Sequence, residues 1–285
     1  MMVFEDINAW RRERASRSAT GTVGFVPTMG ALHRGHVSLV ERSVRENSAT
    51  IVSIFVNATQ FNESADLANY PRTLEQDLAV LECEGVDYVL LPRHEQLYPD
   101  GYRYRVVETE CAATLEGVHR PGHFDGVLTV VLKLLQLAAA DRAYFGEKDW
   151  QQLHLIRGMT DAFFLPTSIV ACPTVRESSG LAMSSRNVFL STEERRLAPM
   201  LYQALLAGQR AIETGVADPQ AVQAMMRKVL EAQSAIHIDY LVICDPDTLE
   251  PLERIDRQAV ILGAIRLGSV RLIDNVLTRR TRGGT

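Results

Sequence analysis

Cysteine is scarce in this sequence: four occur in 285 residues, and no two of them form a CxxC pair. We therefore expect free thiols in a reducing cytoplasm rather than disulfides or a structural zinc site. Long apolar runs are missing too. The longest, around 127–140, is interrupted by threonine, lysine and glutamine, and the first residues contain no apolar segment of signal-peptide length. We expect a cytoplasmic protein with no membrane partner.

An excess of positive charge is also missing, since the formal net charge is −5. Nucleic-acid-binding proteins present a basic face, so we expect no nucleic-acid partner and favour chemistry on small molecules. With 46% hydrophobic and 23% charged residues, the composition is that of an ordinary globular protein. Because 285 residues exceed the usual size of a single domain, we expect two domains.

Short β-branched and apolar runs alternate with amphipathic segments of helix length over the first 175 residues. Strands are predicted at 22–26, 50–56, 86–91, 143–145 and 168–172, and helices at 37–46, 73–84, 126–140 and 151–163. This alternation predicts an α/β domain, with a Rossmann-like, doubly wound parallel sheet that is covered by helices on both faces.

The pattern changes after residue 175. Helices are predicted at 192–213 and 219–232, and three strand-like segments follow, IDYLVICD, AVILGAI and VRLIDN. We therefore predict two domains, residues 1–175 and a smaller α+β lid domain at residues 176–285. We expect the final residues, TRRTRGGT, to be frayed.

Polar segments follow three of the predicted strands: VPTMG, FVNATQF and YFGEKD. The carboxyl ends of parallel strands meet at one edge of the sheet, where such folds bind ligands, so we predict one pocket. Beyond the first strand, His33 and His36 flank Gly35, and Gly30 also lets the backbone approach a ligand. A helix starting near His36 would suit phosphate, and imidazoles can donate hydrogen bonds to phosphate oxygens. The alternative is a structural role for both histidines.

Two later segments carry charged groups that suit a nucleotide. Lys148 and Asp149 follow a predicted strand, where a lysine suits phosphate and an aspartate suits ribose hydroxyls, and Gln152 shares a helix face with Asp149. The alternative is a solvated turn that leads into a helix. In MSSRN, two hydroxyls and Arg186 suit the β- and γ-phosphates, on a mobile loop eased by Gly180. The alternative there is a polar turn that caps the next helix.

Three further segments suggest a substrate or metal site. Asn57 and Gln60 are neutral hydrogen-bonding groups among apolar neighbours, which suits a small substrate with hydroxyl and methyl groups, although Asn57 also fits a satisfied loop amide. The segment 115–124 holds two histidines and an arginine and is a candidate substrate loop. Beyond YPRT, Glu75 and Asp77 favour a helix start, and Asp77 is the candidate magnesium ligand.

In their order and spacing, seven segments are similar to those of the pantoate–β-alanine ligases: VPTMGALHRGH, SIFVNATQF, YPRT, LEG..RPGHFDGV.TVV.KL, FGEKDWQQL.LIR, GLAMSSRN and RLIDN. They span nearly the whole chain. The family belongs to a larger group with an HxGH signature at the first strand–helix turn, which includes class I aminoacyl-tRNA synthetases and cytidylyltransferases. MSSRN stands where those synthetases carry their second signature.

The resemblance implies a reaction in two steps. The carboxylate of pantoate attacks the α-phosphorus of ATP, which gives pantoyl adenylate and pyrophosphate. The amine of β-alanine then attacks the activated carbonyl, which gives AMP and pantothenate, a precursor of coenzyme A. The resemblance also implies Mg²⁺ and a homodimer.

The resemblance implies residue roles as well. Catalytic roles would fall to His33, to His36 as the proton donor, and to Lys148 and Arg186. Gln60 would bind pantoate and β-alanine, with Gln152 on pantoate and Asn57 beside them. The ATP-binding residues would be Met29, Gly30, Ala31, Leu32, His33, Arg34, Gly35, His36, Gly146, Glu147, Lys148, Asp149, Val175, Met183, Ser184, Ser185 and Arg186.

The sequence departs from the family pattern at three places. Ala58 stands where a proline is usual, which removes a restriction on the backbone of Asn57. Phe189 replaces a tyrosine, and the run Leu-Glu-Gln-Asp at 74–77 leaves the magnesium ligand open.

Other functions remain as alternatives. One is an enzyme that transfers the nucleotide itself. Another is a non-catalytic nucleotide-binding subunit, which the intact HxGH, lysine and arginine disfavour. The acidic balance and the lack of an anticodon-binding extension disfavour a tRNA ligase.

Overall fold

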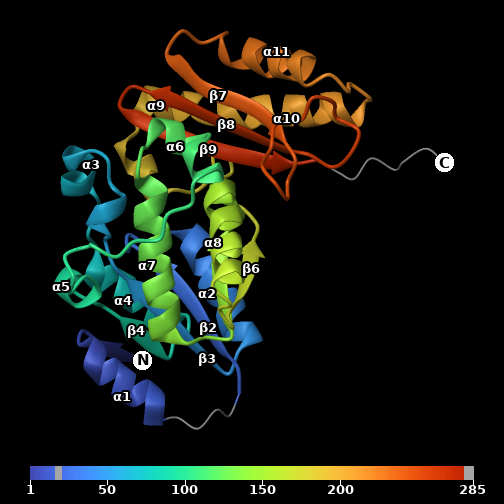
Figure 1. The fold of residues 1–285 in the computed structure, drawn as a ribbon. Coiled ribbons are helices and arrows are strands. Elements are labelled where there is room, and N and C mark those ends of the chain that lie inside the picture. Colours follow the sequence, from blue (N-terminus) through green and yellow to red (C-terminus); the bar gives the residue numbers. More distant parts are fainter. Residues whose placement is uncertain (17–20, 279–285) are drawn as a thin grey trace. The chain divides into compact units, whose positions relative to one another are not determined.

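The structure, a computed structural model, describes residues 1–16 and 21–278. The chain forms two compact units (Figure 1). Met1–Glu147 and Gln151–Pro173 make up the N-terminal unit, and Lys148–Trp150 with Thr174 onwards make up the C-terminal unit. The chain therefore changes unit at residue 173, beside the predicted boundary, and residues 148–150 belong to the C-terminal unit. The tail predicted to be frayed lies, apart from Thr278, outside the described residues.

The N-terminal unit is built on a six-stranded parallel sheet, as the strand–helix alternation predicts. Its strand order is β1-β4-β3-β2-β5-β6. The strands are β1 (Met2–Phe4), β2 (Val23–Thr28), β3 (Ala49–Ile54), β4 (Tyr88–Leu90), β5 (Arg142–Gly146) and β6 (Ser168–Cys172).

Helices lie on both faces of this sheet (Figure 1) because alternate strand residues are buried on opposite sides. Phe25 and Ile51 pack with residues of α1, α7 and α8, whereas Val26 and Val52 pack with residues of α2 and α4. The helices are α1 (Ile7–Ser16), α2 (Arg34–Glu46), α3 (Ser64–Asn69), α4 (Leu74–Cys83), α5 (His94–Leu97), α6 (Glu116–His119), α7 (His123–Ala138) and α8 (Trp150–Ala162), with short 3₁₀ turns η1 (Ala58–Gln60), η2 (Cys111–Ala113) and η3 (Glu147–Asp149).

The strand order reverses between β2 and β5, which are neighbours in the sheet. From β2 the chain proceeds to β3 and β4 on one side, and β5 and β6 lie on the other. Ligands of doubly wound sheets bind beyond the carboxyl ends of the strands at such a reversal. The strands β2 and β5 end at Thr28 and Gly146. The topology therefore predicts that the residues following these two positions bind a ligand.

The N-terminal residues form two elements that the sequence analysis did not predict. Residues 2–4 pair in parallel with β4 at the sheet edge, and α1 follows. A three-residue edge strand is too short to show a period. The indole of Trp10 is buried and donates to the carbonyl of Leu137 at 2.7 Å, so this segment is held by tertiary contacts.

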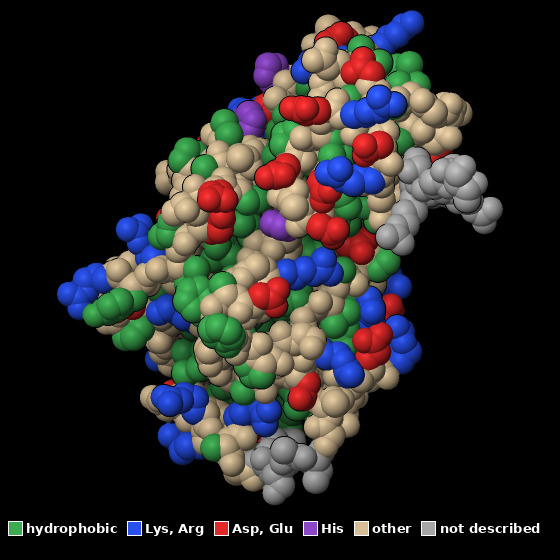
Figure 2. Space-filling model, turned by 45° about the vertical axis from the view of Figure 1, so that its right-hand side comes forward, with side chains coloured by type: hydrophobic (Ala, Val, Ile, Leu, Met, Phe, Trp, Pro, Cys, Tyr) green, Lys and Arg blue, Asp and Glu red, His purple; other side chains and the backbone are tan. Residues whose placement is uncertain are grey.

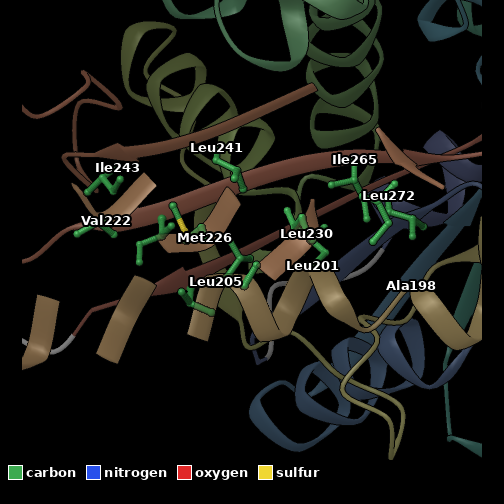
Figure 3. Close-up of a cluster of buried hydrophobic side chains, with 14 of the residues drawn as sticks. Ala198, Leu201, Leu205, Val222, Met226, Leu230, Leu241, Ile243, Ile265 and Leu272 are labelled. Atoms are coloured by element: carbon green, nitrogen blue, oxygen red, sulfur yellow. The ribbon is translucent and has the colours of Figure 1, made fainter. Parts of the chain in front are cut away.

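The C-terminal unit is an antiparallel sheet of β7 (Ile236–Cys244), β8 (Val260–Leu267) and β9 (Val270–Leu277), which confirms the three predicted strands. Figure 3 shows its core, in which Leu201 and Leu205 of α10 (Met200–Glu213) and Met226 of α11 (Pro219–Leu230) belong to one apolar cluster with side chains of the sheet such as Leu241 and Ile265. The single helix predicted at 192–213 is two helices, α9 (Thr192–Leu197) and α10. Pro199 separates them because it has no N–H to donate.

The surface agrees with an ordinary globular protein. On the face drawn in Figure 2, acidic and basic side chains are interspersed rather than separated by sign. Within the described residues, every helix is too short or too polar to cross a membrane.

Candidate active site

His33 and His36 lie together at the start of α2, directly beyond β2. The helix begins at Arg34, two residues before the predicted start, and His33 is its N-cap residue. The Nδ1 of His33 accepts from the N–H of Gly35 at 3.1 Å, and the Nδ1 of His36 accepts from the N–H of His33 at 3.4 Å. The centroids of the two imidazole rings are 4.0 Å apart.

These hydrogen bonds assign the tautomer of both rings. A nitrogen that accepts from a backbone N–H cannot carry the proton, so Nε2 is the protonated nitrogen of each imidazole. The pair therefore presents two N–H donors at the carboxyl edge of the sheet. The imidazoles also accept hydrogen bonds from the backbone N–H groups of His33 and Gly35, at the helix terminus where phosphate binding is predicted.

The loop between β2 and α2, the histidine loop, is held by the carboxylate of Asp77, a residue that is 3% exposed. Gly30 and Ala31 have φ values of +80° and +51°, which turns successive N–H groups to one side. The N–H groups of Ala31 and Leu32 donate to the two oxygens of Asp77 at 2.9 and 2.8 Å, and the hydroxyl of Thr73 donates to both oxygens at 3.2 Å.

This arrangement does not fit the predicted role of Asp77 as a magnesium ligand. Both carboxylate oxygens hold the histidine loop, and the side chain is buried among backbone N–H groups that would repel a cation. Among residues 1–16 and 21–278, no three His, Cys, Asp or Glu side chains gather as a metal site. We assign Asp77 to the positioning of the loop.

Asn57 is 1% exposed, and its hydrogen bonds are satisfied within the protein. Its amide Nδ2 donates to the side-chain oxygen of Gln60 and to the carbonyl of Gly126, both at 3.1 Å. Its Oδ1 accepts from the hydroxyls of Thr59 and Tyr98 at 3.0 and 2.9 Å. Burial raises the pKa of Tyr98 to about 12, so its hydroxyl stays protonated as a donor. Asn57 therefore positions Gln60, which favours the satisfied-amide alternative over substrate contact.

The side chain of Gln60 lies close to the loop beyond β2. Its Nε2 is 3.3 Å from the sulfur of Met29, so the segments after β2 and β3 meet in the N-terminal unit. Gln152, at the start of α8, is partly exposed. Its neighbour Gln151 is buried and bonds to the backbone of residues 111–116, so the first of the two glutamines is structural.

Residues of the candidate substrate loop and of α7 position Gln60. The Nδ1 of His123 forms a hydrogen bond of 2.8 Å with the carbonyl oxygen of Gln60. The guanidinium of Arg120 lies 3.0 Å from the Nε2 of the same histidine. A Cβ on Gly126 would lie 2.6 Å from the carbonyl oxygen of Thr59, so glycine is needed for this approach. Of the candidate substrate loop 115–124, the structure thus gives Arg120 and His123 a supporting role. The motif GHFDG was the signal available in the sequence.

The residues after β5 divide between the two units. Gly146 and Glu147 belong to the N-terminal unit, whereas Lys148 and Asp149 belong to the C-terminal unit. The ammonium of Lys148 is 3.6 Å from the carboxylate of Asp149. The carbonyl of Lys148 accepts from the side chain of Asn275 at 2.9 Å. The two charged side chains are therefore neighbours, as their order in the sequence requires.

Residues 175–183, which lead directly into the predicted mobile loop, form a hydrogen-bonded hairpin. Its backbone bonds include those from Glu177 to Leu181 and from Met183 to Val175. A Cβ on Gly180, at φ +93°, would lie 2.9 Å from the ring of Tyr202, so glycine is needed for this close packing.

The serines and arginine of MSSRN follow this hairpin directly. Ser184 caps the 3₁₀ turn η4 (Ser185–Phe189) by accepting from the N–H of Arg186 at 3.3 Å. The predicted polar cap is therefore present, although it caps a short 3₁₀ turn. Met183, Ser184, Ser185 and Arg186 are all partly exposed.

Comparison with known proteins gives one consistent family. The sequence model of a family described as Pantoate-beta-alanine ligase matches residues 2–277. The pantothenate synthetase of Roseiflexus castenholzii is 49% identical over 277 residues, which cover 97% of this chain and 99% of that protein.

Solved structures agree with this result. The crystal structure of pantothenate synthetase from Thermus thermophilus matches with a TM-score of 0.91 and 45% identity, over 97% of this chain and 99% of that one. A pantoate-beta-alanine ligase from Francisella tularensis, complexed with beta-gamma ATP and beta-alanine, matches with a TM-score of 0.81 and 38% identity, over 97% of each chain.

Proposed function

The chain belongs to the pantoate–β-alanine ligase family, and from this premise we propose how its own residues join pantoate to β-alanine with ATP. The enzyme forms pantoyl adenylate and pyrophosphate, and then pantothenate and AMP. The observation that carries the assignment of residues is the histidine pair beyond β2, whose hydrogen bonds leave the protons on Nε2.

In the first step, a carboxylate oxygen of pantoate bonds to the α-phosphorus of ATP and the bond from that phosphorus to the bridging oxygen breaks. Negative charge grows on the α-phosphate and on the departing pyrophosphate. His36 donates its Nε2 proton in a hydrogen bond to this charge, and His33 acts beside it. Preorganised donors of this kind contribute most where charge develops in the transition state. Met29 to Gly35 line the nucleotide, and Gly146 and Glu147 lie at the end of the neighbouring strand.

Cationic and hydroxyl groups of the C-terminal unit bind the phosphates and ribose. Lys148 supplies a point charge and Arg186 a fork of N–H donors, with Ser184 and Ser185 beside it and Asp149 on ribose hydroxyls. Val175 contacts adenine, and Met183 lies over the phosphates with the serines and Arg186. The role of residues 176–285 as a lid remains a prediction.

Gln60 binds pantoate and β-alanine, and Gln152 binds pantoate. The role of Gln60 is supported by the contacts that position it. Asn57 bonds to its side chain, His123 and Arg120 bond to its carbonyl, and its amide lies beside Met29 in the loop between β2 and α2. In the second step, the amine of β-alanine forms a bond to the carbonyl carbon of the adenylate, and the bond from that carbon to the phosphate oxygen breaks to release AMP.

Magnesium enters this proposal as part of the substrate, bound to the phosphates of ATP, which need only one or two carboxylates from a protein. No step is assigned to a resident ion, because Asp77 is committed to the histidine loop. We also propose a cytoplasmic homodimer, on the family resemblance and the scattered cysteines. Sedimentation of the purified chain measures the subunit number.

Pyrophosphate exchange tests the proposed reaction. ATP–pyrophosphate exchange is expected to need pantoate and to proceed without β-alanine, whereas AMP release is expected to need both. An enzyme that transfers the nucleotide itself would release pyrophosphate with no dependence of AMP on an amine. Exchange in the absence of pantoate would contradict the proposal.

A further inference from the structure

Two consecutive residues of β9, Asp274 and Asn275, each bond to one of the segments to which we assign phosphate binding. Successive side chains of a strand leave opposite faces. Asp274 pairs with Arg176 at the base of the hairpin that leads to MSSRN, and Asn275 bonds to the backbone of Lys148. These residues end the motif RLIDN, to which the reaction assigns no part.

Asp274 is a carboxylate on the core side of the sheet. Its side chain is 4% exposed, and Leu272 and Val276, two residues away on either side, belong to the apolar core. The guanidinium of Arg176 grips it with two bonds of 2.5 and 2.9 Å and stacks 3.6 Å from the ring of Tyr202. A buried ion pair generally stabilises a fold no better than a well-packed apolar pair. The contribution of this ion pair is instead that it fixes the position of Arg176 relative to β9.

That geometry extends from Arg176 to the phosphate-binding residues. Arg176 donates to the carbonyl of Gly180 at 3.2 Å, across the hairpin, and pairs with Ala182 in the backbone ladder. Met183 then donates to the carbonyl of Val175 at 3.0 Å, immediately before the serines. The position of Arg176 therefore sets where the segment carrying Arg186 begins.

Asn275 acts on the other segment. Its amide donates to the carbonyl of Lys148 at 2.9 Å, within a stretch of three residues that belongs to the C-terminal unit. A second bond from this stretch to the same unit runs from the indole of Trp150 to the carbonyl of Pro246 at 3.4 Å. The shorter bond is the one at the lysine itself.

We propose that Asp274 and Asn275 are positioning residues that hold Lys148 and Arg186 in one fixed arrangement for the phosphates of ATP. This inference rests on the phosphate-binding roles proposed above. Two flexible cations bind a polyphosphate better when their backbones are already placed, since less freedom is lost on binding. A single strand does this for segments 127 and 98 residues away in the sequence.

The test compares two variants with matched controls in the same unit. Asn275→Ala removes the hydrogen bond to the carbonyl of Lys148. Its control, Gln209→Ala, removes a side-chain hydrogen bond of 3.0 Å to the carbonyl of Leu277, at the end of the same strand. Arg176→Lys disturbs an ion pair whose arginine is 17% exposed. Arg271→Lys disturbs the pair with Asp239, whose arginine is 18% exposed.

The measurements are the KM values for ATP and pantoate, pyrophosphate exchange, amide formation from preformed pantoyl adenylate, and thermal unfolding. We expect Asn275→Ala and Arg176→Lys to raise the ATP KM and slow exchange roughly 3- to 10-fold, the worth of one hydrogen bond. The pantoate KM and amide formation stay near wild type. Each control lowers thermal stability comparably but leaves the ATP KM unchanged.

Equal effects of variants and controls on the ATP KM, or equal changes in the ATP and pantoate KM values, would overturn the inference. If Arg176→Lys fails to fold, Asn275→Ala decides alone. Lys148→Ala and Arg186→Ala separate this inference from the proposed function. A normal ATP KM in both of these variants would contradict the proposed phosphate-binding roles. A raised KM in both, with Asn275→Ala and Arg176→Lys normal, removes only the positioning role.

Discussion

The histidine loop of the N-terminal unit is held by a buried carboxylate, that of Asp77, whereas the hairpin before MSSRN in the C-terminal unit is held by a partly buried guanidinium, that of Arg176. The histidine loop has positive φ angles and turns N–H groups inward, and the carboxylate of Asp77 accepts from them. The hairpin pairs its own N–H groups and leaves the carbonyl of Gly180, to which Arg176 donates. The sign of the charge follows the backbone group that each turn leaves without a ladder partner.

The loops also differ in what they present to a ligand. The histidine loop uses its imidazoles both to cap α2 and to offer Nε2 protons. The hairpin directly precedes the serines and the arginine of MSSRN, the groups proposed to bind phosphate. The predictions below therefore compare residues proposed to act on phosphate with residues that hold a loop.

The largest effect is expected at His36. His36→Gln keeps a side-chain acceptor at the third helix position, which favours the helix start, but removes the imidazole. Losing one transition-state donor typically costs about 2.7–4 kcal/mol, so pyrophosphate exchange should fall by about two orders of magnitude or more. His36→Ala should be equally slow and also less stable. An active His36→Gln enzyme would show that the imidazole only caps the helix.

Arg186→Ala is expected to come next. A charged hydrogen bond contributes roughly 1.5–3 kcal/mol, so adenylate formation should slow by roughly 10- to 100-fold. Amide formation from preformed pantoyl adenylate should change much less, because pyrophosphate has then left. Rapid-quench measurement of the two half-reactions separates them, and equal slowing of both would contradict a phosphate role.

Asp77→Asn tests what holds the histidine loop. The amide faces two backbone N–H groups with only one acceptor, so one donor loses its partner, at a cost of roughly 1–3 kcal/mol in the free energy of unfolding. We expect about a tenfold lower kcat/KM for ATP with an unchanged dependence on Mg²⁺ concentration. Glu75→Gln, on the exposed side of the same helix, is the control and should be silent. A shifted Mg²⁺ dependence would restore Asp77 as a metal ligand.

The smallest effect is expected at Gly180. Gly180→Ala introduces both strain at φ +93° and a contact of 2.9 Å with Tyr202. Gly215→Ala, at φ +102° with open space around the new Cβ, introduces the strain alone. Both should lower stability by about 1 kcal/mol or more, but only Gly180→Ala should raise the ATP KM, by a few fold. A matching KM in the two variants would mean that the hairpin does not place Arg186.

Local patterns predicted most of the fold. The strands from β2 to β9 lie where apolar runs indicated, except that their ends differ by a few residues, because burial of a sheet imposes its period on the sequence. The division of the 192–213 helix was foreseeable from Pro199. The edge strand β1 was not, since three residues carry no period.

The candidate site divides in the same way. HxGH at a strand–helix turn was visible, and so was the polar cap at Ser184, because capping depends on residues a few positions apart. That Asn57 is saturated, and that His123 and Gly126 support Gln60, depends on α7 lying against η1. No spacing in the sequence reports that contact.

The sequence by itself determined the alternation of strands and helices and the placement of polar motifs at strand ends, because periodicity and turn chemistry act over a few residues. The tertiary structure decided which side chains hold the loops of the candidate site. Asp77 meets the histidine loop across 46 residues, Asp274 meets Arg176 across 98, and Asn275 meets Lys148 across 127. The sequence does not distinguish a carboxylate or amide that faces a ligand from one that faces a group of the protein backbone. Only the packing of distant segments determines its partner.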